Sequence, residues 1–442
     1  MWRNFKQRFS TFILGHLHSK FLQSLLLQRL YCWIDLGLGR IELWRNSYYH
    51  AVEHFCKASR RVQVETPSRA CARQNLQPFF RRGRNPVLGC FLRSSACAEL
   101  RSRFGRMAFP ENVTLKGAML PLKAANLSTG EKGVLVLTYG FAFQALHAIF
   151  DTERLKRHYW MVLEPANDRI EDPAYILFSD CEAVIEAGNP KIRDGLRALD
   201  AGFQTVKLSS SDWVDSDVFH PIGDCPKIYD LIYVANWSLN KRHSLLFSAL
   251  AKLCPTIKVA LVGFHWERPR TSIEAEMKRY NVAQQCEIFE NVSHRELNRL
   301  LNASRINLLL SRREGGNRAL YEAMFAGIPS IVISSCEGID PAAVNEQTGI
   351  LAAENELEYV IDDTLNSAAN FTPRIWAEAN SGYINSTSTL NHKLQQLSLA
   401  QGCEWTNDIV PKINGPNISY KLRSDSENLR PALEHLASFL RC

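Results

Sequence analysis

The chain has 442 residues, 46% of them hydrophobic and 22% charged, so it can bury two cores and is not an intrinsically disordered protein. Its formal net charge of +7 is unevenly distributed, because residues 1–106 contain 19 Lys and Arg against 5 Asp and Glu. Twelve singly placed cysteines argue against a disulfide framework or a zinc module, and no apolar stretch is long enough to span a membrane, so we expect a cytoplasmic protein.

Residues 1–106 form a basic N-terminal segment with an amphipathic stretch from Phe12 to Leu43 and a cluster of arginines at Arg81, Arg82 and Arg84. Three interpretations remain open for it. The segment completes the first domain, docks on the anionic inner face of a membrane, or is an organelle-targeting extension. No recognisable nucleic-acid-binding module accompanies the charge, so we expect no nucleic-acid partner.

Alternating strands and helices predict two α/β domains, at residues 107–221 and 222–370. In the first domain the expected strands are Gly133–Tyr139, Tyr159–Leu163 and Phe203–Leu208, with a helix at Phe141–Phe150. In the second domain they are Leu231–Ala235, Val259–Gly263, Cys286–Val292, Ile306–Leu310 and Ser330–Ile333. This alternation predicts parallel sheets, whose ligands bind beyond the carboxyl ends of the strands.

Residues 371–442 carry apolar side chains at helical spacing, such as Leu390, Leu394 and Leu397, and then Leu433 and Leu436. We expect at least one helix of this segment to return to the first domain. His147 and His158 of the first domain are interpreted as structural residues.

The most informative segment, Ser311 to Ser330, has the sequence SRREGGNRALYEAMFAGIPS. It predicts a strand, a glycine-bearing turn and a helix, with Glu314 and Glu322 eight positions apart. Gly315 and Gly316 permit a tight turn and a close approach to a ligand, and the N–H groups of Asn317 and Arg318 open the helix. Such a helix start attracts anions, phosphate above all.

This spacing resembles the E-x7-E motif of family 4 glycosyltransferases (glycosyl transferases group 1) of the GT-B fold. The resemblance implies that Glu314 contacts a donor sugar and that Glu322 contacts the ribose of a nucleotide. The stretch from Asn236 to His243 resembles the family's first loop in the second domain, where an Arg and a Lys bind the donor diphosphate. Lys241 matches the lysine and Asn236 stands in place of the arginine, for which Arg242, Arg313 or Arg318 would compensate.

A third match lies just before the second domain, where the residues resemble the family's N-G-V-D-x-x-x-F-x-P linker. Val214, Asp215, Phe219 and Pro221 occupy its positions. We therefore interpret Asp215 and Asp217 as turn and hinge residues and not as the metal-binding D-x-D of another glycosyltransferase fold. No metal and no cofactor are expected.

The resemblance implies two Rossmann-like parallel-sheet domains that face each other across a cleft, with C-terminal helices returning to the first domain. It implies a hexosyltransferase that moves a sugar from a nucleoside-diphosphate sugar to a hydroxyl of a sugar or lipid-linked acceptor, with retention, in glycan, glycolipid or polysaccharide synthesis. Glu314 and Lys241 would be the catalytic residues. The donor-binding set would be Asn236, Lys241, Arg313, Gly315, Gly316, Asn317, Arg318 and Glu322.

Two points stay open at this stage. Glu164 and Asp168, which follow a predicted strand of the first domain, are either groups that address the acceptor hydroxyl or ordinary loop carboxylates. The alternatives to a transferase are a nucleotide-sugar epimerase of the same fold and a non-catalytic protein that binds a nucleotide sugar. Release of nucleotide in the presence of an acceptor would separate a transferase from a binding protein.

Overall fold

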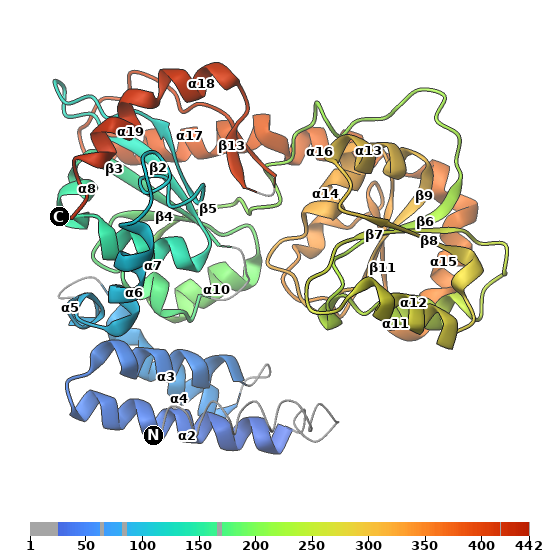
Figure 1. Ribbon diagram of the computed structural model, residues 1–442, viewed down its shortest axis with the longest axis horizontal. Helices are drawn as coiled ribbons and strands as arrows, with labels where there is room; N and C mark the ends of the chain where they lie inside the picture. The colour runs from blue at the N-terminus through green and yellow to red at the C-terminus, as the bar shows by residue number, and fades with distance from the viewer. Residues whose placement is uncertain (1–24, 62–65, 82–85, 166–169, 416, 442) are drawn as a thin grey trace.

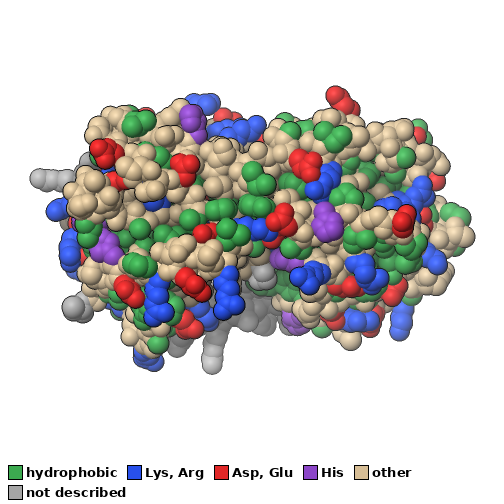
Figure 2. Space-filling view, turned by 90° about the horizontal axis from the view of Figure 1, so that it is seen from above, with side chains coloured by type: hydrophobic (Ala, Val, Ile, Leu, Met, Phe, Trp, Pro, Cys, Tyr) green, Lys and Arg blue, Asp and Glu red, His purple; other side chains and the backbone are tan. Residues whose placement is uncertain are grey.

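A computed structural model describes residues 25–61, 66–81, 86–165, 170–415 and 417–441. Figure 1 shows two α/β lobes side by side, with a group of N-terminal helices below the first lobe. In the view from above, Lys and Arg side chains are interspersed with Asp and Glu over the visible face (Figure 2). Among the described helices, none combines the length and the apolarity needed to cross a bilayer.

The N-terminal helices share a hydrophobic core with the first sheet. They are α2 (Leu25–Trp44), α3 (Tyr48–Arg61), α4 (Pro67–Phe80), α5 (Pro86–Leu92) and α6 (Ser95–Phe104). Leu36 of α2 and Phe55 of α3 belong to the same buried cluster as Leu135 and Met161 of the sheet. The packing is therefore continuous from α2 to the first lobe.

The first sheet has the order β1-β2-β3-β4-β5. Its strands are β1 (Met119–Lys123), β2 (Gly133–Thr138), β3 (Tyr159–Glu164), β4 (Ala183–Glu186) and β5 (Gln204–Val206). The last four run parallel, as predicted for this domain, and β1, which was not predicted from the sequence, pairs antiparallel with β2. The connecting helices are α7 (Gly140–Ile149), α8 (Thr152–His158), α9 (Pro173–Ile176) and α10 (Pro190–Ala198).

The second sheet is entirely parallel, with the order β11-β10-β9-β6-β7-β8. Its strands are β6 (Tyr229–Val234), β7 (Val259–Gly263), β8 (Cys286–Glu290), β9 (Ser304–Leu309), β10 (Ser330–Ile333) and β11 (Gly349–Ala352). The main helices are α11 (His243–Leu250), α12 (Arg270–Arg279), α13 (His294–Asn302), α14 (Arg318–Phe325) and α15 (Leu357–Ser367). The strand order reverses between β6 and β9, which is where sheets of this kind bind ligands.

The C-terminal segment returns to the first lobe, as expected (Figure 1). It contains α16 (Pro373–Asn380), α17 (Gly382–Ala400), β12 (Lys412–Asn414), β13 (Ile418–Tyr420), α18 (Arg423–Asn428) and α19 (Arg430–Ala437). Leu390 and Leu394 of α17 pack with Val162 on one face of the first sheet. Leu436 of α19 joins the cluster on the other face, so the segment covers both faces.

Candidate active site

Lys241 and Glu314 meet at the point where the strand order of the second sheet reverses. Lys241 closes a short 3-10 helix (Leu239–Lys241) after β6, and Glu314 lies in the loop after β9. The Nζ atom of Lys241 is 2.5 Å from Oε1 of Glu314. Their side chains are only 16% and 9% exposed, so water screens this pair less than it would screen a surface pair. The structure thus brings the two predicted catalytic residues together.

The backbone of Glu314 is held by the loop that follows β10. Its N–H donates to the carbonyl oxygen of Glu337 at 2.7 Å, and the N–H of Glu337 donates to the carbonyl oxygen of Arg312 at 2.9 Å. Gly338 has φ +96°, and a Cβ at this position would lie 1.6 Å from the carbonyl oxygen of Glu314. Only glycine permits so close an approach, so Gly338 is part of what positions the glutamate.

The predicted glycine turn opens towards the space between the two lobes. Gly316 has φ +148°, and a Cβ there would lie 2.5 Å from Oγ of Ser211 in the interdomain linker. Asn317 caps α14, since its side-chain oxygen accepts from the N–H of Leu320 at 2.9 Å. Gly316 and Asn317 line an interdomain pocket of about 320 Å³, together with Ser211 and Asp212 from the linker side. Lys241, Glu314 and Glu322 do not line this pocket.

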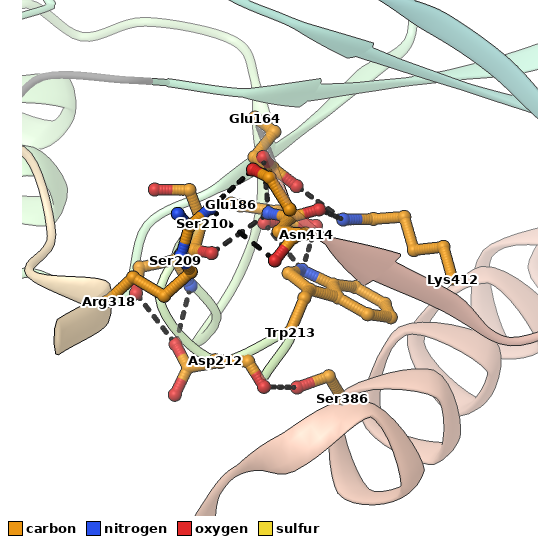
Figure 3. Close-up of polar contacts among 11 residues, drawn as sticks. Glu164, Glu186, Ser209, Ser210, Asp212, Trp213, Arg318, Ser386, Lys412 and Asn414 are labelled. Carbon is orange, nitrogen blue, oxygen red and sulfur yellow. Dashed lines mark hydrogen bonds and ion pairs between the residues drawn. The ribbon is translucent and has the colours of Figure 1, made fainter. Parts of the chain in front are cut away.

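Glu322 and Arg318 form a second pair, on α14. Glu322 is buried, and its Oε1 lies 2.8 Å from Nε of Arg318. The guanidinium of Arg318 also donates to the carbonyl oxygens of Asn414 and Gly415, at the hairpin that follows the return to the first lobe. Figure 3 shows Arg318 extending from the second lobe towards Asn414. Arg318 therefore links the lobes and is engaged by neighbours other than a ligand.

The two remaining donor-site predictions, Asn236 and Arg313, lie in the same two loops. Oδ1 of Asn236 is buried and has no hydrogen-bond partner among the described residues. Arg313 pairs with Glu337, with Nε 3.1 Å from Oε2. Sequence reasoning missed Glu337, because nothing in the segment after β10 connects it with the segment after β9.

A buried histidine lies directly after the Lys241 loop. His243 packs against the rings of Tyr233 and Trp237, and neither ring nitrogen has a hydrogen-bond partner among the described residues. Burial, reinforced by the positive charges of Arg268 and Lys241, lowers the pKa of His243 to about 3. The histidine is therefore neutral at pH 7 and adds no charge beside Lys241.

Glu164, one of the two acceptor-side candidates, is paired within the first lobe (Figure 3). It is the last residue of β3, not a loop residue, and it is 3% exposed. Its Oε2 lies 2.5 Å from Nζ of Lys412, and its Oε1 accepts from Nδ2 of Asn414 at 2.9 Å. The other candidate, Asp168, lies outside the described residues.

Two neighbours of Glu164 were not identified from the sequence. Glu186, at the end of β4, accepts from the indole Nε1–H of Trp213 at 3.2 Å. Burial and the charge of Glu164 raise the pKa of Glu186 to about 8. Lys412 comes from β12, more than two hundred residues later in the chain, and lies 3.8 Å from the centre of the Trp213 ring. No local pattern marks either residue.

The aspartates of the linker face a cation contributed by the protein itself. Nζ of Lys421 is 2.6 Å from Oδ1 of Asp215 and 2.7 Å from Oδ2 of Asp217. Within the described ranges, no group of three or more His, Cys, Asp and Glu side chains is placed to hold a metal ion.

His147, interpreted as structural, is buried against Phe178, and burial lowers its pKa to about 3.

Residues 225–371 match the family model described as Glycosyl transferases group 1. The second lobe is a glycosyltransferase group 1 domain. This match covers both Lys241 and the segment from Glu314 to Glu322, so these residues lie within the part of the chain that is similar to the family. No curated protein matches the chain in sequence.

Solved structures with a similar fold include sucrose-phosphate synthase from Thermosynechococcus elongatus. It shares 19% sequence identity with this chain over 60% of this chain and 74% of that one, with a TM-score of 0.51. The Anabaena protein HepE in complex with UDP and glucose is 13% identical over 60% and 77% of the two chains, with a TM-score of 0.47. The lipopolysaccharide outer core galactosyltransferase WaaB is 15% identical over 61% and 76%, with a TM-score of 0.46. The likeness to the synthase identifies the two-lobed architecture as the GT-B fold, as predicted.

Proposed function

We propose that this glycosyltransferase moves a hexose from a nucleoside-diphosphate sugar to an acceptor hydroxyl with retention of configuration. The observation that carries the proposal is the ion pair of Lys241 and Glu314 at the reversal of strand order, inside the glycosyltransferase group 1 domain. A cation and an oriented carboxylate are the two groups that such a transfer requires beside the sugar. The ammonium forms an ion pair with the phosphate, and the carboxylate accepts hydrogen bonds from the sugar hydroxyls.

In the proposed reaction, the bond between the anomeric carbon and the diphosphate oxygen breaks, and the nucleoside diphosphate leaves with the bonding electrons. Lys241 stabilises the negative charge that grows on this leaving group. Glu314 orients the donor sugar through its hydroxyls, and Glu322 accepts from the ribose hydroxyls. The acceptor oxygen bonds to the same anomeric carbon, and its proton passes to a phosphate oxygen of the leaving group.

The ion pair has a consequence for donor binding. Before a donor binds, Glu314 pairs with Lys241 at 2.5 Å and keeps the ammonium in place. A donor diphosphate supplies stronger negative charge, so Lys241 gains phosphate contacts while one Glu314 oxygen becomes available to a sugar hydroxyl. The pair therefore positions both groups before the substrate arrives, which lowers the cost of ordering them.

For the acceptor, we infer a lipid-linked molecule, reached through contact of α2 with a membrane surface. Five large apolar side chains of α2 recur on one side of the helix and are 46–84% exposed, namely Leu30, Trp33, Ile34, Ile41 and Trp44. Exposed arginines at 29, 40 and 45 flank them. An amphipathic helix with Trp on its apolar side and Arg at its border suits the interface of an anionic membrane.

The proposed transfer is tested by calorimetric titration with UDP, GDP and ADP, followed by an assay of nucleotide release with candidate acceptors. Binding of one diphosphate and its release from the matching sugar nucleotide only when an acceptor is present would support a transferase. Binding without release would favour a non-catalytic binding protein, and conversion of the bound sugar without an acceptor would favour an epimerase.

The membrane contact is tested by sedimentation with vesicles of phosphatidylcholine and an anionic lipid. The variant Trp33→Gln/Trp44→Gln is expected to lose most vesicle binding. Ile375→Gln, at a 62% exposed apolar residue on α16, serves as the matched control. If both variants and the wild type sediment equally with the vesicles, α2 is not the element that contacts the membrane.

A further inference from the structure

A second hollow, of about 690 Å³, lies between the N-terminal helices and the second lobe. We call it the arginine pocket. Its described lining consists of five arginines, two glutamates and three neutral polar residues, and the arginines are Arg60, Arg61, Arg242, Arg312 and Arg313. No aliphatic or aromatic side chain belongs to this described lining, so the pocket suits a strongly hydrophilic ligand.

The arginines come from two different parts of the fold. Arg60 and Arg61 lie in the last turn of α3, whereas the other three lie in the loops after β6 and β9. Those two loops are tied to each other, because Nδ2 of Asn240 donates to the carbonyl oxygen of Arg313 at 2.8 Å and the N–H of Arg312 donates to the carbonyl oxygen of Asn240 at 3.0 Å. The pocket is thus lined on one side by the N-terminal helices and on the other by the loops of the proposed donor site.

The pocket adjoins the Lys241–Glu314 pair. Arg242 directly follows Lys241, and Arg313 directly precedes Glu314, so the residues that line the pocket flank both members of the pair. In the proposed reaction Glu314 faces the donor sugar. A molecule held in the arginine pocket would therefore lie beside the sugar and not beside the nucleotide base.

Acidic neighbours neutralise only part of the positive charge. Arg242 pairs with Glu354, with Nη1 2.7 Å from Oε1, and Arg313 pairs with Glu337. Arg312 is exposed and forms no ion pair with any described carboxylate. Arg60 and Arg61 pair with Asp172 and Asp35, so four of the five guanidinium groups have a carboxylate partner. Arg312 carries the remaining positive charge, which favours an anionic ligand.

The two arginines of α3 line the pocket and do not use all of their N–H donors within the described part of the chain. Arg60 donates from Nη1 to Oδ2 of Asp172 and from Nε to the carbonyl oxygen of Cys56, each at 3.2 Å. Its Nη2 has no hydrogen-bond partner among the described residues. Arg61 donates from Nε to Oδ2 of Asp35 at 2.6 Å. A guanidinium carries five N–H donors in a fixed fork, so each arginine can bind a further group of acceptor oxygens.

We propose that the arginine pocket binds a phosphate group carried by the acceptor. The inference rests on the proposed function, because it places the phosphate next to the donor sugar. A phosphate monoester offers three terminal oxygens and nearly two negative charges, which match several guanidinium forks better than one carboxylate would. The same chemistry is present in a soluble sugar phosphate and in a lipid-linked phosphate.

The test uses the full-length protein, first saturated with the nucleoside diphosphate that it binds most tightly, so that the donor site is occupied. Inorganic phosphate is then titrated by calorimetry into the wild type, Arg60→Gln/Arg312→Gln and Arg430→Gln. Arg430 is a matched control, since it is 70% exposed on α19 and pairs with Glu434. We expect the double variant to bind phosphate at least tenfold more weakly, with unchanged affinity for the nucleotide and an unchanged melting temperature. Equal phosphate affinity in all three proteins would overturn the proposal.

If the double variant melts early, Arg312→Gln alone provides the test, because Arg312 is exposed and pairs with no described carboxylate. A wild type that binds phosphate through Arg60 and Arg312 but binds no nucleoside diphosphate would support the pocket and contradict the proposed transferase. The two hypotheses can therefore fail separately.

The source of the phosphate is distinguished with two further probes. A hexose 6-phosphate is titrated in solution, and vesicles of phosphatidylcholine with and without phosphatidic acid are sedimented with each protein. A loss of hexose phosphate binding in the double variant would indicate a soluble acceptor. A loss restricted to the phosphatidic acid vesicles would indicate a lipid-linked one. If neither probe distinguishes the double variant from Arg430→Gln, the pocket does not recognise phosphate.

Discussion

Lys241 and Glu314 lie 73 residues apart in the chain, yet Nζ of the first is 2.5 Å from Oε1 of the second. The separation spans three strands, and the contact exists because β9 returns to pair with β6 after β7 and β8 have been added on the other side. In a parallel sheet, the loops after two adjacent strands meet at their carboxyl ends.

Removing the charge of Lys241 should reduce turnover more than donor affinity. We expect Lys241→Met to lower kcat by about 10²- to 10³-fold, because the leaving diphosphate loses a fixed cation where its charge develops. Nucleotide release is the measurement. Lys252→Met, at a 64% exposed lysine paired with Glu358, should leave turnover within about twofold. Equal rates in both variants would place leaving-group stabilisation elsewhere.

The double variant Lys241→Met/Glu314→Gln tests whether the two residues act together. Residues in one ion pair show non-additive effects, so the double variant should lose much less than the product of the two single losses. Fully additive losses in nucleotide release would show that the two side chains act independently.

Glu322→Gln should weaken binding of the nucleoside diphosphate. A carboxylate that accepts from ribose hydroxyls contributes about 1.5–3 kcal/mol, so we expect affinity to fall roughly tenfold or more in calorimetry. Glu358→Gln on α15 is the control, since its partner Lys252 is on the surface. An unchanged dissociation constant for Glu322→Gln would rule out the ribose contact.

Gly338→Ala should lower both stability and turnover, because it displaces the backbone that positions Glu314. The added Cβ would lie 1.6 Å from the carbonyl oxygen of Glu314, so the loop must move and take the glutamate with it. We expect a loss of about 2–4 kcal/mol in the free energy of unfolding and at least tenfold lower turnover. Gly130→Ala is the control, because Gly130 also has a positive φ, +76°, but no atom within 4 Å of a Cβ. It should lose only about 1–2 kcal/mol and retain full turnover.

Glu186 should make stability depend on pH. Its pKa in the folded protein, about 8, is higher than the ordinary value of 4.5, so the folded state binds the proton more tightly than the unfolded state. The resulting stabilisation is complete below about pH 4.5, decreases as pH rises, and is lost above about pH 8. Its slope is at most about 1.4 kcal/mol per pH unit.

The measurement is the free energy of unfolding in urea, compared at each pH with that of Glu186→Gln. The glutamine keeps an oxygen for the indole N–H of Trp213 but does not titrate. The wild type should lose stability relative to the variant between pH 5 and pH 8. A constant difference over this range would contradict the assignment of the proton to Glu186.

The sequence allowed the second domain to be predicted closely. The segments Val259–Gly263 and Ser330–Ile333 are strands with the predicted bounds, because their short apolar runs end at polar or glycine-rich turns. The segment predicted as Cys286–Val292 ends earlier, at Glu290, where Asn291 has a positive φ. Parallel strands buried on both faces leave a clear continuous apolar signal.

The first domain was predicted less completely. The strands Met119–Lys123 and Ala183–Glu186 were missed, and the first contains a proline, which argues against a central strand. The antiparallel pairing of the first with β2 also has no local signal, since strand direction depends on the connection and not on the strand's own composition.

The sequence by itself determined most of the strands and helices, and also the turn that carries Glu314 and the helix that carries Glu322, because periodicity, glycine turns and capping act between near neighbours. Only the tertiary structure decided which charges meet. Lys241 reaches Glu314, Lys412 reaches Glu164, and the arginines of α3 face Arg312, each pair joined by strand order or by helix packing. Such contacts depend on how distant elements pack, and the local sequence around a residue does not predict which distant residue it contacts.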